Sequence, residues 1–302
     1  MDYSDLKLGF CPFCGAKAQD MYCNSCNKSF KVLTEFGKIP PELIDAIKWG
    51  ENISEFQKSI ILEILSEMVK IPGGSFTMGI KENNGKPLER PEYQTPHRVT
   101  LSPYYLSKFL VTQRQWFAFM PDHDCFNVGE ELPVDKISWN ESMEFAKKLK
   151  ELSGISFALP TEAQWFWAAK ECNNYNPNSY SGSSEIEEVA WTKQNTKCSQ
   201  RPGLKKPNVL GLYDMSGNLS EHCLDDKGKF SNKPLIDPYR PLGNLKQTIR
   251  KGGSFSMDNY VFDESGSSYN INSRDDRIYY GQMHDSGLRL AIYDSSILNS
   301  ID

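Results

Sequence analysis

The chain has 302 residues, of which 39% are hydrophobic and 24% are charged. This mixture is typical of a soluble globular protein, and the length allows one large domain or two. A net charge of −5 and a pI of about 5.6 give no overall attraction to nucleic acids or anionic membranes, so neither is expected as a partner. Since the first residues lack the features of a signal peptide and no apolar run of about 18 residues occurs, the sequence predicts a cytoplasmic protein.

Residues 1–30 carry two Cys-x-x-Cys pairs, Cys11 with Cys14 and Cys23 with Cys26, separated by eight residues. Each pair can place two thiolates on one side of a tight turn, and the two pairs together complete the tetrahedral shell that Zn²⁺ prefers. Because four protein ligands leave no open position, the sequence predicts a structural zinc ribbon rather than a catalytic zinc or a redox dithiol. Free thiolates also favour a reducing cytoplasm. The ribbon either docks a partner or caps the N-terminus.

Residues 31–68 predict a helical connector. Pro41 favours the start of a short helix that Gly50 can end. Ser54, followed three residues later by Gln57, has the spacing of a capping box at the start of a second helix. The apolar residues of this second helix fall on one face, which we expect to pack on the main domain rather than on a foreign partner: Ile60, Ile61, Ile64, Leu65 and Met68.

From residue 69 onward, short β-like runs alternate with capped helices and long polar loops. Three further capping boxes predict helix starts, at Thr112 with Gln115, Ser138 with Glu141, and Thr161 with Gln164. Gly154 suits the end of the second of these helices. Residues 97–101 and 289–293 predict strands. Because strands and helices do not alternate regularly, the pattern predicts an α+β domain without a parallel sheet.

Residues 206–226 form a stretch that Pro207, Gly211 and Gly217 interrupt, although it is rich in apolar side chains. A loop that enters a core must be held by specific contacts, so we expect this stretch to be central to the domain. Five other blocks follow a fixed order around it: Ile71 to Gly79, Val134 to Trp139, Leu159 to Trp165, Arg250 to Phe255, and Gly287 to Ala291.

These ordered blocks resemble the sulfatase-modifying-factor, or formylglycine-generating-enzyme, family. The central stretch resembles the family motif Asn-x-x-Gly-Leu-Tyr-Asp-Met-x-Gly-Asn-Val-Trp-Glu-Trp, with Ser220 and His222 in place of its two tryptophans. The resemblance implies a C-type-lectin-like α+β fold in which little of the chain is regular. The expected organisation is a zinc ribbon at 1–30, a connector at 31–68, this domain at 69–294 and a tail at 295–302.

In the catalytic members of this family, two cysteines that follow the Gly-Gly-Ser-aromatic block bind copper(I) and activate oxygen. Alignment on Ser254 puts Met257 and Phe262 at those two places. Copper(I) selects soft ligands, and one neutral thioether cannot replace two thiolates. The resemblance therefore implies a member without the copper site, and no catalytic residue is assigned. A histidine iron site of the ergothioneine type is not expected, because the four histidines never occur as His-x-x-x-His.

Other chemically capable residues have structural interpretations. The four remaining cysteines are scattered and are expected to be small buried hydrophobes: Cys125, Cys172, Cys198 and Cys223. Asp225 and Asp226 are expected to be solvated loop carboxylates. The turn from Asn218 to Glu221 matches a family turn that coordinates calcium, so the resemblance implies a Ca²⁺ site made by Asn218, Leu219 and Glu221. The alternative for Glu221 is a structural buried carboxylate.

The segment from Ser254 to Ser286 is strongly biased, since 19 of its 33 residues are Ser, Tyr, Asn or Asp. Such a composition is typical of binding loops, although a solvated loop has it too. Because interface energy concentrates in Tyr and Arg, the expected anchors of a ligand are Tyr260, Tyr269, Arg277, Tyr279 and Tyr280. Some non-catalytic family members are variable proteins of diversity-generating retroelements. Adenine mutation of Asn codons in them yields Ser, Tyr and Asp, the bias found here.

Two functions follow from the sequence. The first is a non-catalytic module that binds a ligand, expected to be a protein, through residues 254–286. The alternative is a metal-dependent oxidase or another enzyme of the family that uses a non-cysteine site. The sequence leaves the identity of the ligand and the oligomeric state open.

Overall fold

The computed structural model describes residues 39–80, 95–243, 247–257, 269–278 and 283–293. For residues 275–278 and for four short strands it describes the backbone alone. These strands form two hairpins, one from β1 (Tyr22–Cys23) and β2 (Lys28–Ser29), the other from β5 (Glu82–Asn83) and β6 (Lys86–Pro87). Within the described part of the chain, no helix is long and apolar enough to cross a membrane.

All four predicted capping boxes are confirmed. In each, the N-cap hydroxyl accepts the amide hydrogen of the third helical residue, whose own side chain accepts the N-cap amide hydrogen. The capped helices are α3 (Glu55–Ser66), α4 (Gln113–Phe117), α5 (Trp139–Ser153) and α6 (Glu162–Ala169). Gly154 ends α5 in the left-handed conformation that glycine tolerates best, as predicted. The short α7 (Ile186–Val189) has no side-chain cap.

The first helix is shorter than the sequence predicts, because α2 (Pro41–Asp45) ends well before Gly50. The amide hydrogens of Lys48 and Gly50 instead bond to the carbonyls of Ser153 and Leu152 at the end of α5, at N···O distances of 2.7 and 2.9 Å. These long-range bonds give α5 partners for its last carbonyls and draw the chain out of the helix.

Three sheets build the domain. The first has the antiparallel order β3 (Met68–Ile71), β8 (Tyr104–Ser107), β15 (Ala291–Ile292) and β9 (Phe157–Ala158). The second has the order β13 (Asp275–Ile278), β12 (Gln247–Lys251), β10 (Ser220–Asp226) and β14 (Ser286–Gly287). The third has the order β11 (Leu235–Ile236), β7 (His97–Leu101) and β4 (Gly74–Met78).

Two of these pairings are parallel, although the sequence predicts no parallel sheet, and both lie in sheets whose other pairings are antiparallel. Strand β10 pairs in parallel with β14, with Ser220 opposite Ser286, and β11 pairs in parallel with β7. Each parallel contact is only two residues long, and several other helices or strands, rather than a single crossover helix, lie between its two strands along the chain. The regular alternation of strand and helix that signals a parallel sheet is therefore missing from the sequence.

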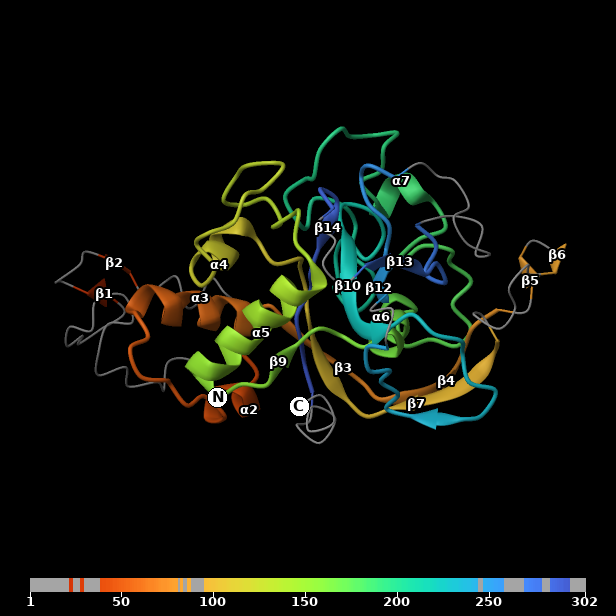
Figure 1. Cartoon of the computed structure of the whole chain (residues 1–302), viewed down its shortest axis with the longest axis horizontal. Helices are drawn as coiled ribbons and strands as arrows, with labels where there is room; N and C mark the ends of the chain where they lie inside the picture. The colour runs from red at the N-terminus through yellow and green to blue at the C-terminus, as the bar shows by residue number, and fades with distance from the viewer. Residues whose placement is uncertain are drawn as a thin grey trace.

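One hydrophobic core joins the elements. The apolar face of α3 packs, as expected, into the same cluster as Phe145 of α5 and Trp165 of α6. Figure 1 shows α3 and α5 in one half of the molecule and β10, β12 and β13 in the other half. Every residue of α6 is buried, and this helix packs against β4, β7, β10 and β12. The core thus fixes β10 and β12, whose ends carry the candidate site.

Candidate functional site

The candidate site begins directly after β12, at Gly252 and Gly253. Both glycines have positive φ, +88° and +70°, which turns the chain sharply into Ser254. The Ser254 hydroxyl is fully buried and donates a hydrogen bond to Oδ2 of Asp285 at 2.7 Å. The Ser256 hydroxyl donates to the same oxygen at 2.8 Å. The turn after β12 is thereby fastened to the segment that precedes β14.

Asp285 is also held by a cation from the neighbouring strand. Nη1 of Arg250 lies 3.3 Å from Oδ1 of Asp285 and donates to the Ser286 hydroxyl at 2.6 Å. Burial opposes ionisation of Asp285, but the Arg250 guanidinium and the hydroxyls of Ser254 and Ser256 outweigh it and hold its pKa below the usual range. The carboxylate is therefore charged and satisfied.

Met257 follows this cluster in the chain and is buried next to β10. Its side chain is buried, and its sulfur lies 3.9 Å from the Ser220 hydroxyl. The Tyr269 hydroxyl donates to the Met257 carbonyl at 2.5 Å, and the Tyr269 ring is only 1% exposed. Tyr269, which was expected among the ligand anchors, is therefore buried and holds the backbone at Met257 by a hydrogen bond.

In the turn expected to bind calcium, the side chains of Asn218 and Glu221 already form hydrogen bonds with other protein groups. Both carboxylate oxygens of Glu221 accept hydrogen bonds from Arg289, and Oε2 also accepts one from the Trp165 indole at 2.7 Å. The Asn218 side chain exchanges two hydrogen bonds of 2.9 Å with the backbone of Gln200. A calcium ion at this turn would have to share Glu221 with Arg289, and the calcium site stays a prediction.

A family comparison identifies the domain that carries these residues. Residues 57–293 match the model of the sulfatase-modifying factor enzyme 1-like domain. The chain belongs to this family. Relatives include a protein named chaperone protein LppX from Paenibacillus barcinonensis, 28% identical over 211 residues that cover 53% of this chain and 71% of the relative. A formylglycine-generating enzyme from Streptomyces coelicolor is 22% identical over 261 residues, covering 64% of this chain and 80% of the enzyme.

The solved structures show that the fold is shared. Variable protein 1 from Treponema denticola superposes with a TM-score of 0.63 at 23% identity, covering 75% of this chain and 95% of that protein. PvdO from Pseudomonas aeruginosa superposes with a TM-score of 0.61 at 19% identity, covering 75% and 94%. The domain is therefore α+β with the C-type-lectin-like architecture of formylglycine-generating enzymes, as the sequence predicts.

Three of the four thiols in the described part of this family member are unsuited to ionise. Cys172 and Cys198 are only partly buried, so the expectation that all four cysteines are buried is wrong for these two. Burial raises the pKa of Cys125 to about 11 and that of Cys172 to about 12. Cys223 is fully buried, and burial together with Glu162 and Asp225 raises its pKa well above the usual range. Within the described residues, no three His, Cys, Asp or Glu side chains are grouped so as to hold a metal ion.

His222, which replaces a family tryptophan, is fully buried in β10. Its Nε2 donates to the Ile137 carbonyl at 3.1 Å, while Nδ1 has no hydrogen-bond partner within the described structure. Burial and the nearby Arg250 lower its pKa to about 4, so the ring is neutral at pH 7. It packs as a core residue and carries no charge to the site.

Asp225 and Asp226 are not the solvated carboxylates that the sequence predicts. Both are buried, because every residue of β10 is covered by neighbouring segments. Burial and the neighbouring Glu162 raise the pKa of Asp225 to about 7. Asp225 also lines a cavity.

One exposed feature beside the candidate site was not predicted. The ring of Phe126, which is 59% exposed, lies with its centroid 4.9 Å from that of His284. His284 in turn meets Phe255 edge-on at 6.2 Å. The loop around residue 126 therefore lies beside the exposed ring of His284, near the end of the segment from Ser254 to Ser286. Because 158 residues separate Phe126 from His284, no local pattern reveals this contact.

Several predicted site residues fall outside the described residues. Cys11, Cys14 and Cys26 of the zinc ribbon do so, and Cys23 is described by its backbone alone. The others are Phe262, Tyr260, Tyr279 and Tyr280, while Arg277 is placed only by its backbone pairing with Thr248. These assignments stay predictions.

Proposed function

We propose that this chain is a non-catalytic member of its family that binds a protein ligand through the loops between residues 254 and 286. The observation that carries the proposal is the closed cluster around Ser254. Where the copper-binding enzymes have their first cysteine, this chain has the buried Met257, whose carbonyl accepts a hydrogen bond from the Tyr269 hydroxyl. Ser254 and Ser256 are bonded to Asp285.

The chemistry of copper(I) supports a loss of the oxidase reaction. Copper(I) needs soft donors, and the Met257 thioether is the soft atom at this cluster. The thiols of Cys125, Cys172 and Cys223 are scattered elsewhere and have raised pKa values, so they supply no thiolates near neutral pH.

The surface next to the cluster supports binding. Phe126 and Val128 are 59% and 85% exposed, and Phe126 lies beside His284. Exposed aromatic side chains of this kind are enriched at protein interfaces. One relative carries the name of a chaperone protein and one structural neighbour that of a variable protein, and both names fit a binding role. Diversification of residues 254–286 by a retroelement is part of this proposal, and an adenine-rich template repeat near the gene would support it.

We also propose that the four-cysteine ribbon holds a structural Zn²⁺ and that the protein works in a reducing cytoplasm. The four free cysteines in the described part of the chain are compatible with such a compartment.

Metal analysis with oxygen uptake tests the non-catalytic role. The purified protein is loaded with copper(I), treated with a mild chelator and analysed for zinc, copper and iron. Oxygen consumption is then measured with a cysteine-containing peptide, and an active formylglycine-generating enzyme serves as the positive control. About one zinc, no retained copper and no oxygen uptake are expected. Stoichiometric copper or iron with oxygen consumption would overturn the proposal in favour of the enzyme.

A variant pair tests the binding face once proximity labelling has identified a partner. Replacement of Tyr279 and Tyr280 by Ala is expected to weaken partner binding at least tenfold, since such anchors are worth about 1–3 kcal/mol each. Tyr175→Ala is the control, because Tyr175 is 92% exposed on a different loop. Equal affinity of both variants and the wild type would rule out this face.

A further inference from the structure

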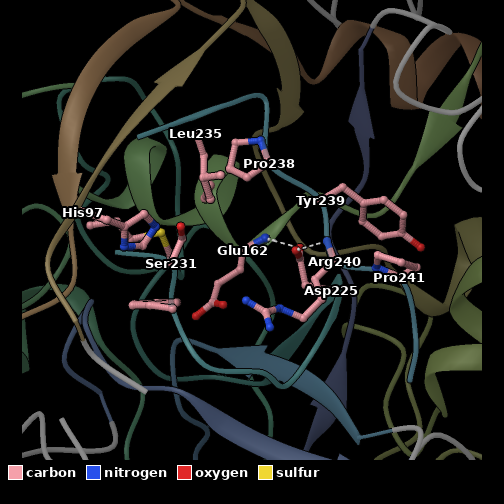
Figure 2. Close-up of a pocket in the computed structure, with 12 residues that line it drawn as sticks. His97, Glu162, Asp225, Ser231, Leu235, Pro238, Tyr239, Arg240 and Pro241 are labelled. Carbon is pink, nitrogen blue, oxygen red and sulfur yellow. Dashed lines mark hydrogen bonds between the residues drawn. The ribbon is translucent and has the colours of Figure 1, made fainter. Parts of the chain in front are cut away.

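A cavity of about 180 Å³ lies at the opposite end of β10 from Ser220, beneath the loop of residues 227–243. Figure 2 shows Leu235 and Pro238 on one side of it, His97 and Tyr239 at its two flanks, and Asp225 and Glu162 in the middle. Its walls are largely apolar and are formed by Met78, Ala163, Phe230, Leu235, Pro238 and Tyr239. A space of this size accepts a small molecule or one side chain.

The Asp225 carboxylate lines this cavity with unused acceptor capacity. Oδ2 accepts the amide hydrogen of Glu162 at 2.7 Å, and Oδ1 accepts that of Arg240 at 2.9 Å. A carboxylate oxygen can accept two hydrogen bonds, so each oxygen keeps one lone pair for a ligand. Although Asp225 is only 7% exposed, it has no ion pair with any described residue.

The other charged side chains of this wall already have hydrogen-bond partners. Both carboxylate oxygens of Glu162 accept from Arg274, at 2.6 and 2.8 Å. The Arg240 guanidinium donates to the Lys229 carbonyl. Of the two acidic residues described in this wall, Glu162 is paired with a cation and Asp225 is not, although Arg240 also lines the cavity.

Two further groups make the cavity suited to a donor. Burial, with smaller contributions from Asp225 and Asp226, raises the pKa of Tyr239, so its hydroxyl is neutral near pH 7. Nδ1 of His97 lies 3.0 Å from the Thr95 carbonyl, to which it must donate, so Nε2 of the neutral ring is an acceptor.

We propose that this cavity is a ligand site for an alkylammonium group, whose methylenes fill the apolar walls and whose ammonium bonds to Asp225. The group can belong to a free small amine or to a lysine side chain. No part of the site overlaps the loops of residues 254–286, so the inference does not depend on the proposed binding function.

Binding is tested on the full chain with n-butylamine as the probe, and with n-butanol and butyrate as neutral and anionic analogues. The ε-methyl group of Met78 reports on the site by NMR after ¹³C-methyl labelling, with Met78→Leu to assign its signal. We expect n-butylamine to shift this signal saturably and to bind at least tenfold tighter than either analogue. Equal affinity for n-butylamine and n-butanol, or no shift of the Met78 signal, would overturn the proposal.

Two adjacent residues of β11 supply matched variants. Leu235 lines the cavity, whereas Ile236 is 78% exposed and does not. Leu235→Trp is expected to fill the cavity and weaken n-butylamine binding at least tenfold, while Ile236→Trp leaves it unchanged. Asp225→Asn is expected to remove the preference for amine over alcohol. Wild-type binding by Leu235→Trp would show that the amine binds elsewhere and would refute the site.

The source of the group is distinguished by Nα-acetyl-lysine N-methylamide. Saturable binding of this compound with the same Met78 shift would assign the site to a lysine side chain. Binding of n-butylamine alone would assign it to a free amine.

Discussion

The guanidinium of Arg289 grips both carboxylate oxygens of Glu221, with Nε 3.0 Å from Oε2 and Nη2 2.8 Å from Oε1. Both side chains are completely buried. Arg289 also donates to the carbonyls of Ser107 and Tyr213 at 2.7 and 2.6 Å, and the Trp165 indole donates to Glu221. This pair therefore connects β8, α6, β10 and the segment before β15 at the centre of the domain.

Arg289→Met is expected to destabilise the protein by about 3–5 kcal/mol, because it leaves the Glu221 carboxylate buried without its cation. Urea unfolding at pH 7 measures the change. Arg201→Met is the control, since Arg201 pairs with Glu131 at the surface and such pairs contribute less than about 1 kcal/mol. The double variant Arg289→Met, Glu221→Leu should recover part of the loss, since it removes the uncompensated charge. Equal stability of Arg289→Met and Arg201→Met would contradict this role.

Glu67 is expected to make the protein less stable as pH rises. Burial and the neighbouring Glu63 raise its pKa to about 8. The folded state therefore holds this proton more tightly than the unfolded state between about pH 4.5 and 8, and the contribution of Glu67 to stability falls by at most about 1.4 kcal/mol per pH unit in that window. Glu67→Gln should remove this slope.

The measurement for Glu67 is the free energy of unfolding of the wild type and Glu67→Gln at pH 5 and pH 8. The free energy of unfolding of Glu67→Gln, relative to that of the wild type, should be higher at pH 8 than at pH 5. The exposed control Glu51→Gln should show the same pH dependence as the wild type. A constant difference between Glu67→Gln and the wild type at the two values would show that Glu67 does not titrate in this window.

The local part of the fold was predictable and the long-range part was not. The capping boxes at Ser138 and Thr161 lie within four residues of chain and depend only on backbone donors that any helix start leaves free. The early end of α2 depends on carbonyls of α5 about one hundred residues away. The parallel pairing of Ser220 with Ser286 likewise joins segments 66 residues apart. Because β14 has only two residues, its sequence shows no periodicity from which a strand could be predicted.

The position of the candidate site in the sequence could be predicted, but the contacts between its side chains could not. The Gly-Gly-Ser block located Ser254 and Met257, because its glycines need positive φ at the end of β12. The sequence gives no sign that Asp285 binds Ser254, or that Tyr269 lies beneath Met257. Asp225 was misjudged because its sequence is that of a loop, whereas its burial comes from segments that cover β10.

His222 is expected to make the protein less stable as pH falls, the opposite of Glu67. Its pKa is lowered to about 4 by burial and by Arg250, so the unfolded state binds the proton more tightly between about pH 6.5 and 4. Its contribution to stability is complete above about pH 6.5 and is lost as pH decreases to 4. His222→Gln, which can still donate to Ile137, should flatten this loss.

Unfolding free energies at pH 7 and pH 5 compare His222→Gln with the wild type. His284→Gln is the matched control, because His284 is exposed. The deficit in unfolding free energy of His222→Gln relative to the wild type should be smaller at pH 5 than at pH 7, or should change sign. A larger deficit of the variant at pH 5 than at pH 7 would show that protonated His222 is stabilised in the fold.

Removal of the predicted zinc is expected to unfold the N-terminal ribbon and leave the main domain folded. A module of this size cannot bury a sufficient core, so metal binding supplies most of its folding free energy, on the order of 10 kcal/mol. The pair Cys14→Ser and Cys26→Ser should abolish the single bound zinc, measured by elemental analysis. The melting temperature of the main domain should change little, because its core comprises residues from Ile39 onward. Cys172→Ser is the control and should retain the zinc. A full equivalent of zinc in the double variant would place the metal at other ligands.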